Sequence, residues 1–168
     1  MAKWSFKVSS FTPVAVLDAT NFTDAGYMAL MGGSSTQKIE VSEIYMGGQA
    51  VASAPSLMVV SRDSTVQVTP TALGAGNSNA ALDPATAALA APPIAFVASG
   101  TKRQRSATLG LLNLSYNAFG GIVRWHAYDP SENLKMLGNV ASFGELSLSA
   151  YSGGTPGLTG AHMIYETF

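Results

Sequence analysis

Apolar and polar residues alternate along much of this chain with a period of two, the spacing that places successive side chains on opposite faces of a β-strand. Near the N-terminus Trp4, Phe6 and Val8 alternate with polar residues, and near the C-terminus Leu146 and Leu148 do the same. The alternation predicts strands with one buried and one exposed face at both ends of the chain.

The strands predicted at residues 37–46 and 57–61 are apolar on both faces. Strands of this kind are covered on both sides, so we predict that the two form a pair in the middle of a sheet. Gly47 and Gly48 end the first strand. Pro55 stands where the second begins, a position that tolerates a residue without an N–H donor.

Further short strands are predicted at residues 13–17, 122–128, 134–137 and 161–168. Residues 23–33 fit either a capped helix or a strand, and the neighbouring strands favour the strand.

Local signals also predict where strands bend and turn. The apolar pattern changes phase between Leu111 and Leu112, which indicates a β-bulge. Asp129 followed by Pro130 is typical of a type I turn.

About eight to ten short strands joined by polar turns, with almost no helix, place the chain in the all-β class. Four segments end in Gly-Gly at irregular spacings, which indicates turn chemistry and not a repeat. We predict a single-domain antiparallel β-sandwich of jelly-roll type that spans residues 1–168.

Residues 68–106 depart from this pattern, because they are rich in Ala, Pro, Thr and Ser and poor in core material. A segment of this length inside a compact domain is often functional. We predict a long loop excursion from the sheet. Asp83 followed by Pro84 is a good helix start, so one or two helical turns are predicted at residues 84–91.

This excursion also carries the side chains that we predict to bind a partner, either for their exposed apolar surface or for their positive charge. They are Ile94, Phe96, Val97, Lys102, Arg103 and Arg105. Two alternatives stay open. The basic residues form a solvated loop, or the segment folds back over its own sheet and covers a sandwich edge.

The low share of charged residues bears on how the protein surface is covered. The 168 residues are 47% apolar and only 11% charged, against about 25% charged in an average domain. So few charges predict a subunit that is buried against neighbours, a homo-oligomer. The net charge of −1 indicates neither a nucleic-acid nor a membrane partner. Without an apolar span or signal core, we expect assembly in the cytoplasm.

The residues that usually carry catalysis are scarce. Cysteine is absent, and the two histidines, His126 and His162, are not closely spaced as in a cupin metal site, so no metal or cofactor is predicted. His126 and Asp129 could be combined with a serine, but no Gly-x-Ser-x-Gly turn is present. The segment 100–105 lacks the glycine spacing of a phosphate loop. We predict that the protein is not an enzyme.

Glu43 falls on the same extended face as Val41 and Tyr45 unless a bulge turns it outward. A buried carboxylate needs a partner, and Arg62 and Arg124 are the candidates. A structural role is predicted for Glu43, because no second carboxylate is suitably placed for catalysis.

Three stretches in the first half of the chain resemble a known family. They are Lys-Trp-Ser-Phe-Lys-Val-Ser-Ser-Phe-Thr-Pro at residues 3–13, Gln-Lys-Ile-Glu-Val-Ser-Glu-Ile-Tyr-Met-Gly-Gly at 37–48 with its Val-x-Glu-Ile strand, and a Thr-Pro–Asp-Pro loop made of residues 68–73 and 82–88. This pattern is similar to the small jelly-roll decoration (cement) proteins of tailed bacteriophages, which sit on the capsid, often as trimers. The resemblance implies a virion structural protein that binds the major capsid protein. It brings no catalytic residues.

A second function remains open, a carbohydrate- or receptor-binding jelly-roll module of a phage head or tail. Its sugar-stacking surface would consist of aromatic side chains, with Tyr116, Trp125, Tyr128 and Tyr151 as the candidates. Exposed and grouped aromatics would favour this function, whereas a dry interface between copies would favour the decoration protein.

Overall fold

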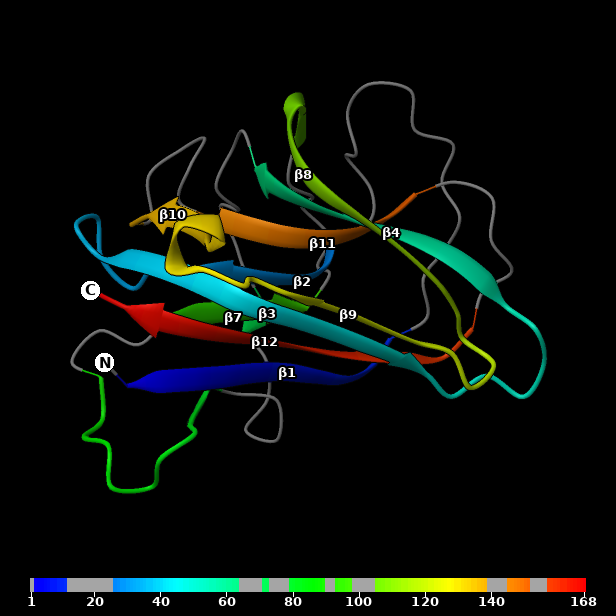
Figure 1. Cartoon of the computed structure of the whole chain (residues 1–168), viewed down its shortest axis with the longest axis horizontal. Coiled ribbons are helices and arrows are strands. Elements are labelled where there is room, and N and C mark those ends of the chain that lie inside the picture. The colour runs from blue at the N-terminus through cyan, green and yellow to red at the C-terminus, as the bar shows by residue number, and fades with distance from the viewer. Residues whose placement is uncertain are drawn as a thin grey trace.

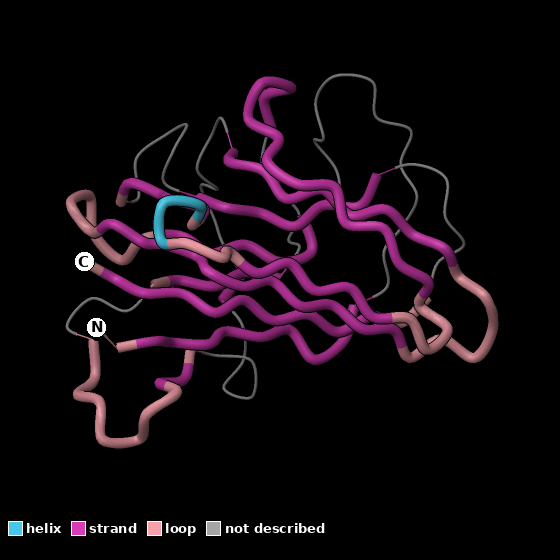
Figure 2. The backbone as a smooth tube through the Cα atoms, viewed as in Figure 1, coloured by secondary structure: helices cyan, strands magenta, loops and turns pink. Residues whose placement is uncertain are grey.

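The computed structural model describes residues 2–11, 26–63, 71–72, 79–89, 93–97, 105–138, 145–151 and 157–168. Within these residues the chain is all-β, apart from one turn of 3₁₀ helix at Pro130–Glu132. The strands form two antiparallel six-stranded sheets, A and B, an arrangement consistent with a β-sandwich (Figure 1). Most of the described backbone is in strands (magenta in Figure 2).

Sheet A has the order β10–β3–β12–β1–β6, and β9 also pairs with β3, next along from β10. Its strands are β1 (Lys3–Phe11), β3 (Lys38–Gly48), β6 (Ala80–Ala81), β9 (Ile122–His126), β10 (Leu134–Leu137) and β12 (Thr159–Thr167).

Sheet B has the order β5–β7–β2–β11–β4–β8. Its strands are β2 (Gly26–Met31), β4 (Pro55–Asp63), β5 (Thr71–Ala72), β7 (Ile94–Val97), β8 (Arg105–Asn117) and β11 (Glu145–Tyr151).

The longer strands pair in a nested order: the earlier a strand lies in the first part of the chain, the later its partner lies in the second part. Strand β4 pairs with β8, β3 with β9 and β10, β2 with β11, and β1 with β12. Two more ladders, β3 with β12 and β4 with β11, complete the sheets. Each of the strands β1 to β4 therefore pairs with a strand from the later part of the chain, β8 to β12.

The core lies between the sheets and draws on both of them. The largest fully buried side chains are Phe6, Met28, Leu30, Ile39, Ile44, Met46, Met58, Met136, Leu146, Leu148 and Tyr165. Burying each apolar side chain of this size contributes roughly 1.5–3 kcal/mol. Methionine, unbranched and flexible, fits the irregular gaps between twisted sheets.

The strands predicted from two-sided apolar patterns are interior strands, as expected. Strand β3 lies between β12 and the β9/β10 pair, and β4 lies between β11 and β8. The prediction that they pair with each other is wrong, because they belong to opposite sheets. Each faces the shared core from its own side, so an apolar pattern could not tell a neighbour in one sheet from a partner across the core.

The structure confirms the predicted bulge at residue 111 and adds one at residue 42. In the β4–β8 ladder Val60 is opposite Leu112 and Ser61 is opposite Gly110, which leaves Leu111 as the extra residue. In the β3–β12 ladder Ser42 is the extra residue between Val41 and Glu43. Each bulge reverses which alternate residues face the core.

Several other predicted elements can be compared with the structure. Residues 26–31 form a strand, as favoured over a helix. Asp129 precedes a 3₁₀ turn, and its carbonyl accepts the Glu132 N–H at 2.9 Å, as in a type I turn. The strand predicted at residues 13–17 lies outside the described residues.

The loop excursion predicted at residues 68–106 differs from the structure, because its described parts contain the short strands β5, β6 and β7. Strand β6 pairs with β1 at one edge of sheet A, and β7 pairs with β2 and β5 in sheet B. These additions cover edges, as the fold-back alternative proposed. The helix predicted at 84–91 is not formed over residues 84–89, where the Asp83 carboxylate accepts the Ala85 N–H in a turn.

Candidate binding surface on sheet A

The two sheets differ on the faces that point away from the core. In the middle of sheet B this face is buried, with Ala29, Val59, Ser61 and Ser147 at most 4% exposed, whereas Asn113 and Ser115 on the edge strand β8 are exposed. On sheet A the bulge at Ser42 turns Glu43 and Tyr45 outward and Ile44 inward, so the outer face is polar. Its charged side chains are Lys3, Lys7, Lys38, Glu40, Glu43, Arg124, Lys135 and Glu166.

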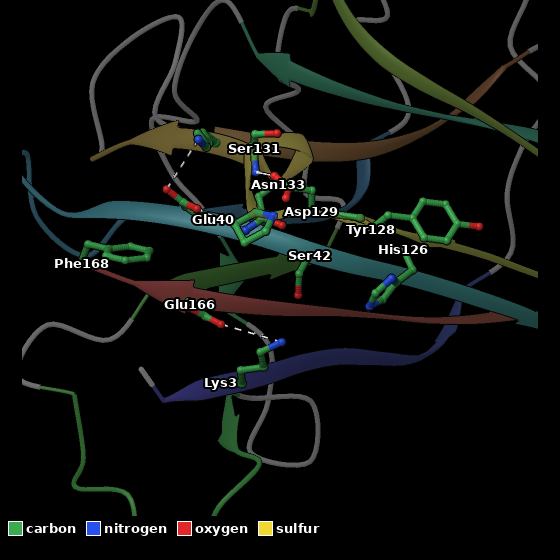
Figure 3. A pocket seen from close by; sticks show the side chains of 13 residues that line it. Lys3, Glu40, Ser42, His126, Tyr128, Asp129, Ser131, Asn133, Glu166 and Phe168 are labelled. Atoms are coloured by element: carbon green, nitrogen blue, oxygen red, sulfur yellow. Dashed lines mark hydrogen bonds and ion pairs between the residues drawn. The ribbon is translucent and has the colours of Figure 1, made fainter.

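An open depression of about 550 Å³ lies on this face. Strands β1, β3 and β12 form its floor with Lys3, Glu40, Ser42 and Glu166, and the β9–β10 connection overhangs it (Figure 3). Residues 126–131 and Asn133 contribute the overhang, and the aromatic ring of Phe168 lies at the opposite side.

Glu40 is the most enclosed charged group of the depression, with its side chain only 9% exposed. It forms ion pairs with Lys38 and, at 4.0 Å, with Lys135, and it accepts a 3.2 Å hydrogen bond from Asn133 Nδ2. Burial alone would raise the pKa of Glu40. The hydrogen bonds from Lys38 and Asn133 and the two lysine charges outweigh burial, so the pKa lies below its ordinary value.

The overhang is held in shape by its own acidic residues. The Asp129 carboxylate accepts the Ser131 N–H at 2.8 Å, which lowers the pKa of Asp129. The Glu132 carboxylate accepts the Tyr128 N–H at 3.0 Å. Tyr128 itself is 96% exposed, and its ring forms a T-shaped contact with the His126 ring at a centroid distance of 6.4 Å.

A second depression, of about 360 Å³, lies further along the same face beside Tyr45 and His162. Arg124 Nη2 donates to Glu43 Oε2 at 2.7 Å, and His162 Nε2 lies 3.7 Å from the other oxygen of Glu43. The His162 ring also stacks on Tyr45, with centroids 5.0 Å apart. The hydrogen bond from Arg124 outweighs burial and lowers the pKa of Glu43.

These geometries decide what the carboxylates can do chemically. Since the pKa values of Glu40 and Glu43 are both lowered, the two groups stay ionised at neutral pH. They can accept hydrogen bonds and pair with cations, but they are poorly suited to donate a proton as general acids. The surface is therefore equipped to bind a polar partner.

Of the two partners predicted for Glu43, Arg124 is confirmed. Arg62 instead donates from Nε to the carbonyl oxygen of Lys135 at 2.7 Å. The bulge alternative for Glu43 is also confirmed, since the side chain points away from the core. The cluster around Glu40 was not predicted. Its only sequence signal is the alternation of Lys38 and Glu40 on one face of a strand.

The residues predicted to bind a partner are only partly placed. Lys102 and Arg103 lie outside the described residues, and Arg105 begins β8 opposite Asp63. Ile94, Phe96 and Val97 belong to β7, whose backbone pairs with β2 and β5. Their side chains are not among those described, so their proposed contacts remain a prediction.

The four aromatic residues proposed for sugar stacking do not form one exposed surface. Tyr116 is buried, Trp125 packs against the core, and Tyr128 is exposed. The side chain of Tyr151 is not described. Among the described residues, no group of three His, Asp or Glu side chains is placed to hold a metal ion. Both histidines lie on strands of sheet A.

No protein-family model, curated protein or solved structure matches this chain. The described part of the chain contains no helix of the length and apolarity needed to cross a membrane.

Proposed function

We propose that the two sheets form a jelly roll. The nested pairing of β1 with β12, β2 with β11, β3 with β9 and β10, and β4 with β8 supports this topology. The eight-strand jelly roll is a long antiparallel hairpin folded into two sheets of four strands. Strands β9 and β10 together take one strand position, beside successive halves of β3.

We propose further that the protein is a non-enzymatic structural subunit of a phage virion, a decoration or cement protein that stabilises the capsid surface. The observation that carries this proposal is the strand order, because jelly rolls are a common architecture of capsid proteins. The resemblance of residues 3–13, 37–48, 68–73 and 82–88 to decoration proteins agrees with it. The proposed partners are the major capsid protein and further copies of this chain, as a trimer.

Capsid binding is the direct test of this function. Purified protein is mixed with capsids of the phage that encodes it, and the mixture is sedimented. We expect saturable binding at a fixed ratio to the shell protein and a higher temperature of capsid disruption. Absence of binding to both immature and expanded capsids would contradict the proposal.

A carbohydrate-binding role is the second candidate, and the depression on sheet A favours it. The exposed Tyr128 ring stands beside Asp129 and Asn133 at an open polar surface, and sugars bind to aromatic faces flanked by amides and carboxylates. Glycan-array binding that is lost in Tyr128→Ala, together with no capsid binding, would favour this role over decoration.

A further inference from the structure

The second depression on sheet A has a floor of bare backbone. Gly47 of β3 stands opposite Gly160 of β12, so two neighbouring strands carry no side chain at this point. In the next row along the strands the rings of Tyr45 and His162 stack. Ile122 of β9 stands beside Gly47. The depression of about 360 Å³ therefore lies where the sheet lacks side chains, between two stacked rings and an aliphatic group.

Lys7 brings a positive charge to this depression. It lies on β1 opposite His162, and its side chain is exposed. Within the described part of the chain Lys7 has no ion-pair partner. The other lysines and the arginine on this face are all paired: Lys3 with Glu166, Lys38 and Lys135 with Glu40, and Arg124 with Glu43. The charge of Lys7 is thus uncompensated among the described residues, and it favours an anionic ligand.

The size, charge and lining of the depression define the kind of ligand. Its volume falls within the range of roughly 300–1,000 Å³ that small-molecule sites occupy. One uncompensated positive charge matches one carboxylate better than a phosphate monoester, which carries about −1.5 to −2 at neutral pH. The stacked rings and Ile122 offer apolar surface to the body of the ligand. The exposed Gln49 side chain, which also lines the depression, can donate to and accept from hydroxyl groups.

We propose that the second depression binds an acidic sugar, a pyranose ring that carries one carboxylate. Lys7 pairs with the carboxylate, and the ring lies over the floor that Gly47 and Gly160 leave bare. Gln49 hydrogen-bonds to the hydroxyl groups of the sugar. This inference deepens the carbohydrate-binding candidate and rests on it, but its site is separate from the depression beside Tyr128.

Titration of the isotope-labelled full chain, followed by the NMR shifts of its amide groups, tests this proposal. The probes are methyl glucuronide, the neutral methyl glucoside, which keeps the ring, and acetate, which keeps the carboxylate. We expect methyl glucuronide to shift the amides of Gly47, Gln49 and Gly160 in a saturable way. The other two probes bind at least about tenfold more weakly, because each lacks one half of the contacts.

Two variants test the residues of the site. Lys7→Gln weakens the binding of methyl glucuronide at least about tenfold, because the carboxylate loses its charged partner. Gly47→Ala weakens it at least about threefold, because the added Cβ occupies the floor. This Cβ stands at ordinary contact distances, 3.4 Å from Ile122 Cγ2 and 3.7 Å from Tyr45 Cε1. The matched control Lys38→Gln removes the same charge from a lysine that lines neither depression, and it binds like the parent. Circular dichroism melting establishes that each variant is folded.

Four results would overturn the proposal. Shifts confined to the amides of Tyr128 and Asp129 leave the carbohydrate-binding candidate standing and reject the acidic-sugar site. Absence of shifts with every probe at about 50 mM rejects the site, and the glycan array then decides the candidate by itself. Acetate that binds as well as methyl glucuronide assigns the depression to carboxylate side chains of a partner protein. Unchanged binding by folded Lys7→Gln removes the charge from the site. If Lys7→Gln does not fold, Lys7→Met is measured in its place and is held to the same outcomes.

Discussion

The hydroxyl of Tyr116 on β8 lies 2.6 Å from Oγ1 of Thr159 on β12, so a buried hydrogen bond joins sheet B to sheet A. The Thr159 hydroxyl also lies 3.1 Å from Gly157 O and donates to it, which leaves its oxygen to accept from Tyr116. Burial raises the pKa of Tyr116, and the hydrogen bond to Thr159 only partly opposes this. The pair ties together the two layers of the sandwich.

Replacing Thr159 by Val removes the acceptor while keeping the side-chain shape. We expect the free energy of unfolding to fall by about 1–3 kcal/mol, because a buried hydroxyl loses its partner. A double-mutant cycle with Tyr116→Phe, measured by urea denaturation, checks the cause. Strict additivity of the two substitutions would mean that the hydroxyl groups are not coupled.

Unlike Tyr116, the fully buried Tyr165 has a hydroxyl group that lacks a hydrogen-bond partner among the described residues. Burial raises its pKa strongly. Tyr165→Phe removes an unpaired polar group from the core, so we expect unchanged stability or a gain of up to about 1 kcal/mol. A clear loss in the same urea titration would show that the hydroxyl is satisfied in solution.

Acid should weaken the fold through Glu43. Its pKa is lower in the folded protein than the ordinary value of 4.5. Ionised Glu43 therefore adds stability above about pH 4.5, and this contribution is lost as the pH falls through the folded pKa. We expect Glu43→Gln to be less stable than the parent at pH 7, with a smaller difference at pH 3.

The control for this pH dependence is Glu132→Gln, which changes an exposed carboxylate outside the Arg124 ion pair. Both variants are unfolded with urea at pH 7, 5, 4 and 3. Equal pH dependence of the parent and Glu43→Gln would refute the role assigned to the ion pair.

Gly48 and Gly110 allow a test of whether a glycine is required by the close approach of a neighbouring backbone. A Cβ on Gly48 would overlap the backbone of Ala118, whereas one on Gly110 would meet nothing within 4 Å. We expect Gly48→Ala to destabilise the protein by about 3 kcal/mol, since the backbones must separate. Gly110→Ala should stay within about 0.5 kcal/mol of the parent. Thermal melting measures both, and equal effects would contradict the close approach.

The alternation of apolar residues by itself predicted most of the described strands. Side chains that share the buried face of a strand stand at every second position, so the pattern is visible in the local sequence. Phase shifts revealed the bulge at Leu111 in the same way. Glu43 shows where this reasoning stops. The sequence left its direction open, and the bulge at Ser42, formed by pairing with β12, turned it toward Arg124.

Residues far apart in the chain were brought together by register alone. Glu40 meets Lys135 because β10 pairs with β3, and no local pattern contains that information. The assignment of β3 and β4 to opposite sheets has the same origin. Local alternation is determined by the sequence near each strand, which decides what is buried. The choice of partner strand and its register depends on the packing of the whole core, which only the tertiary structure decides.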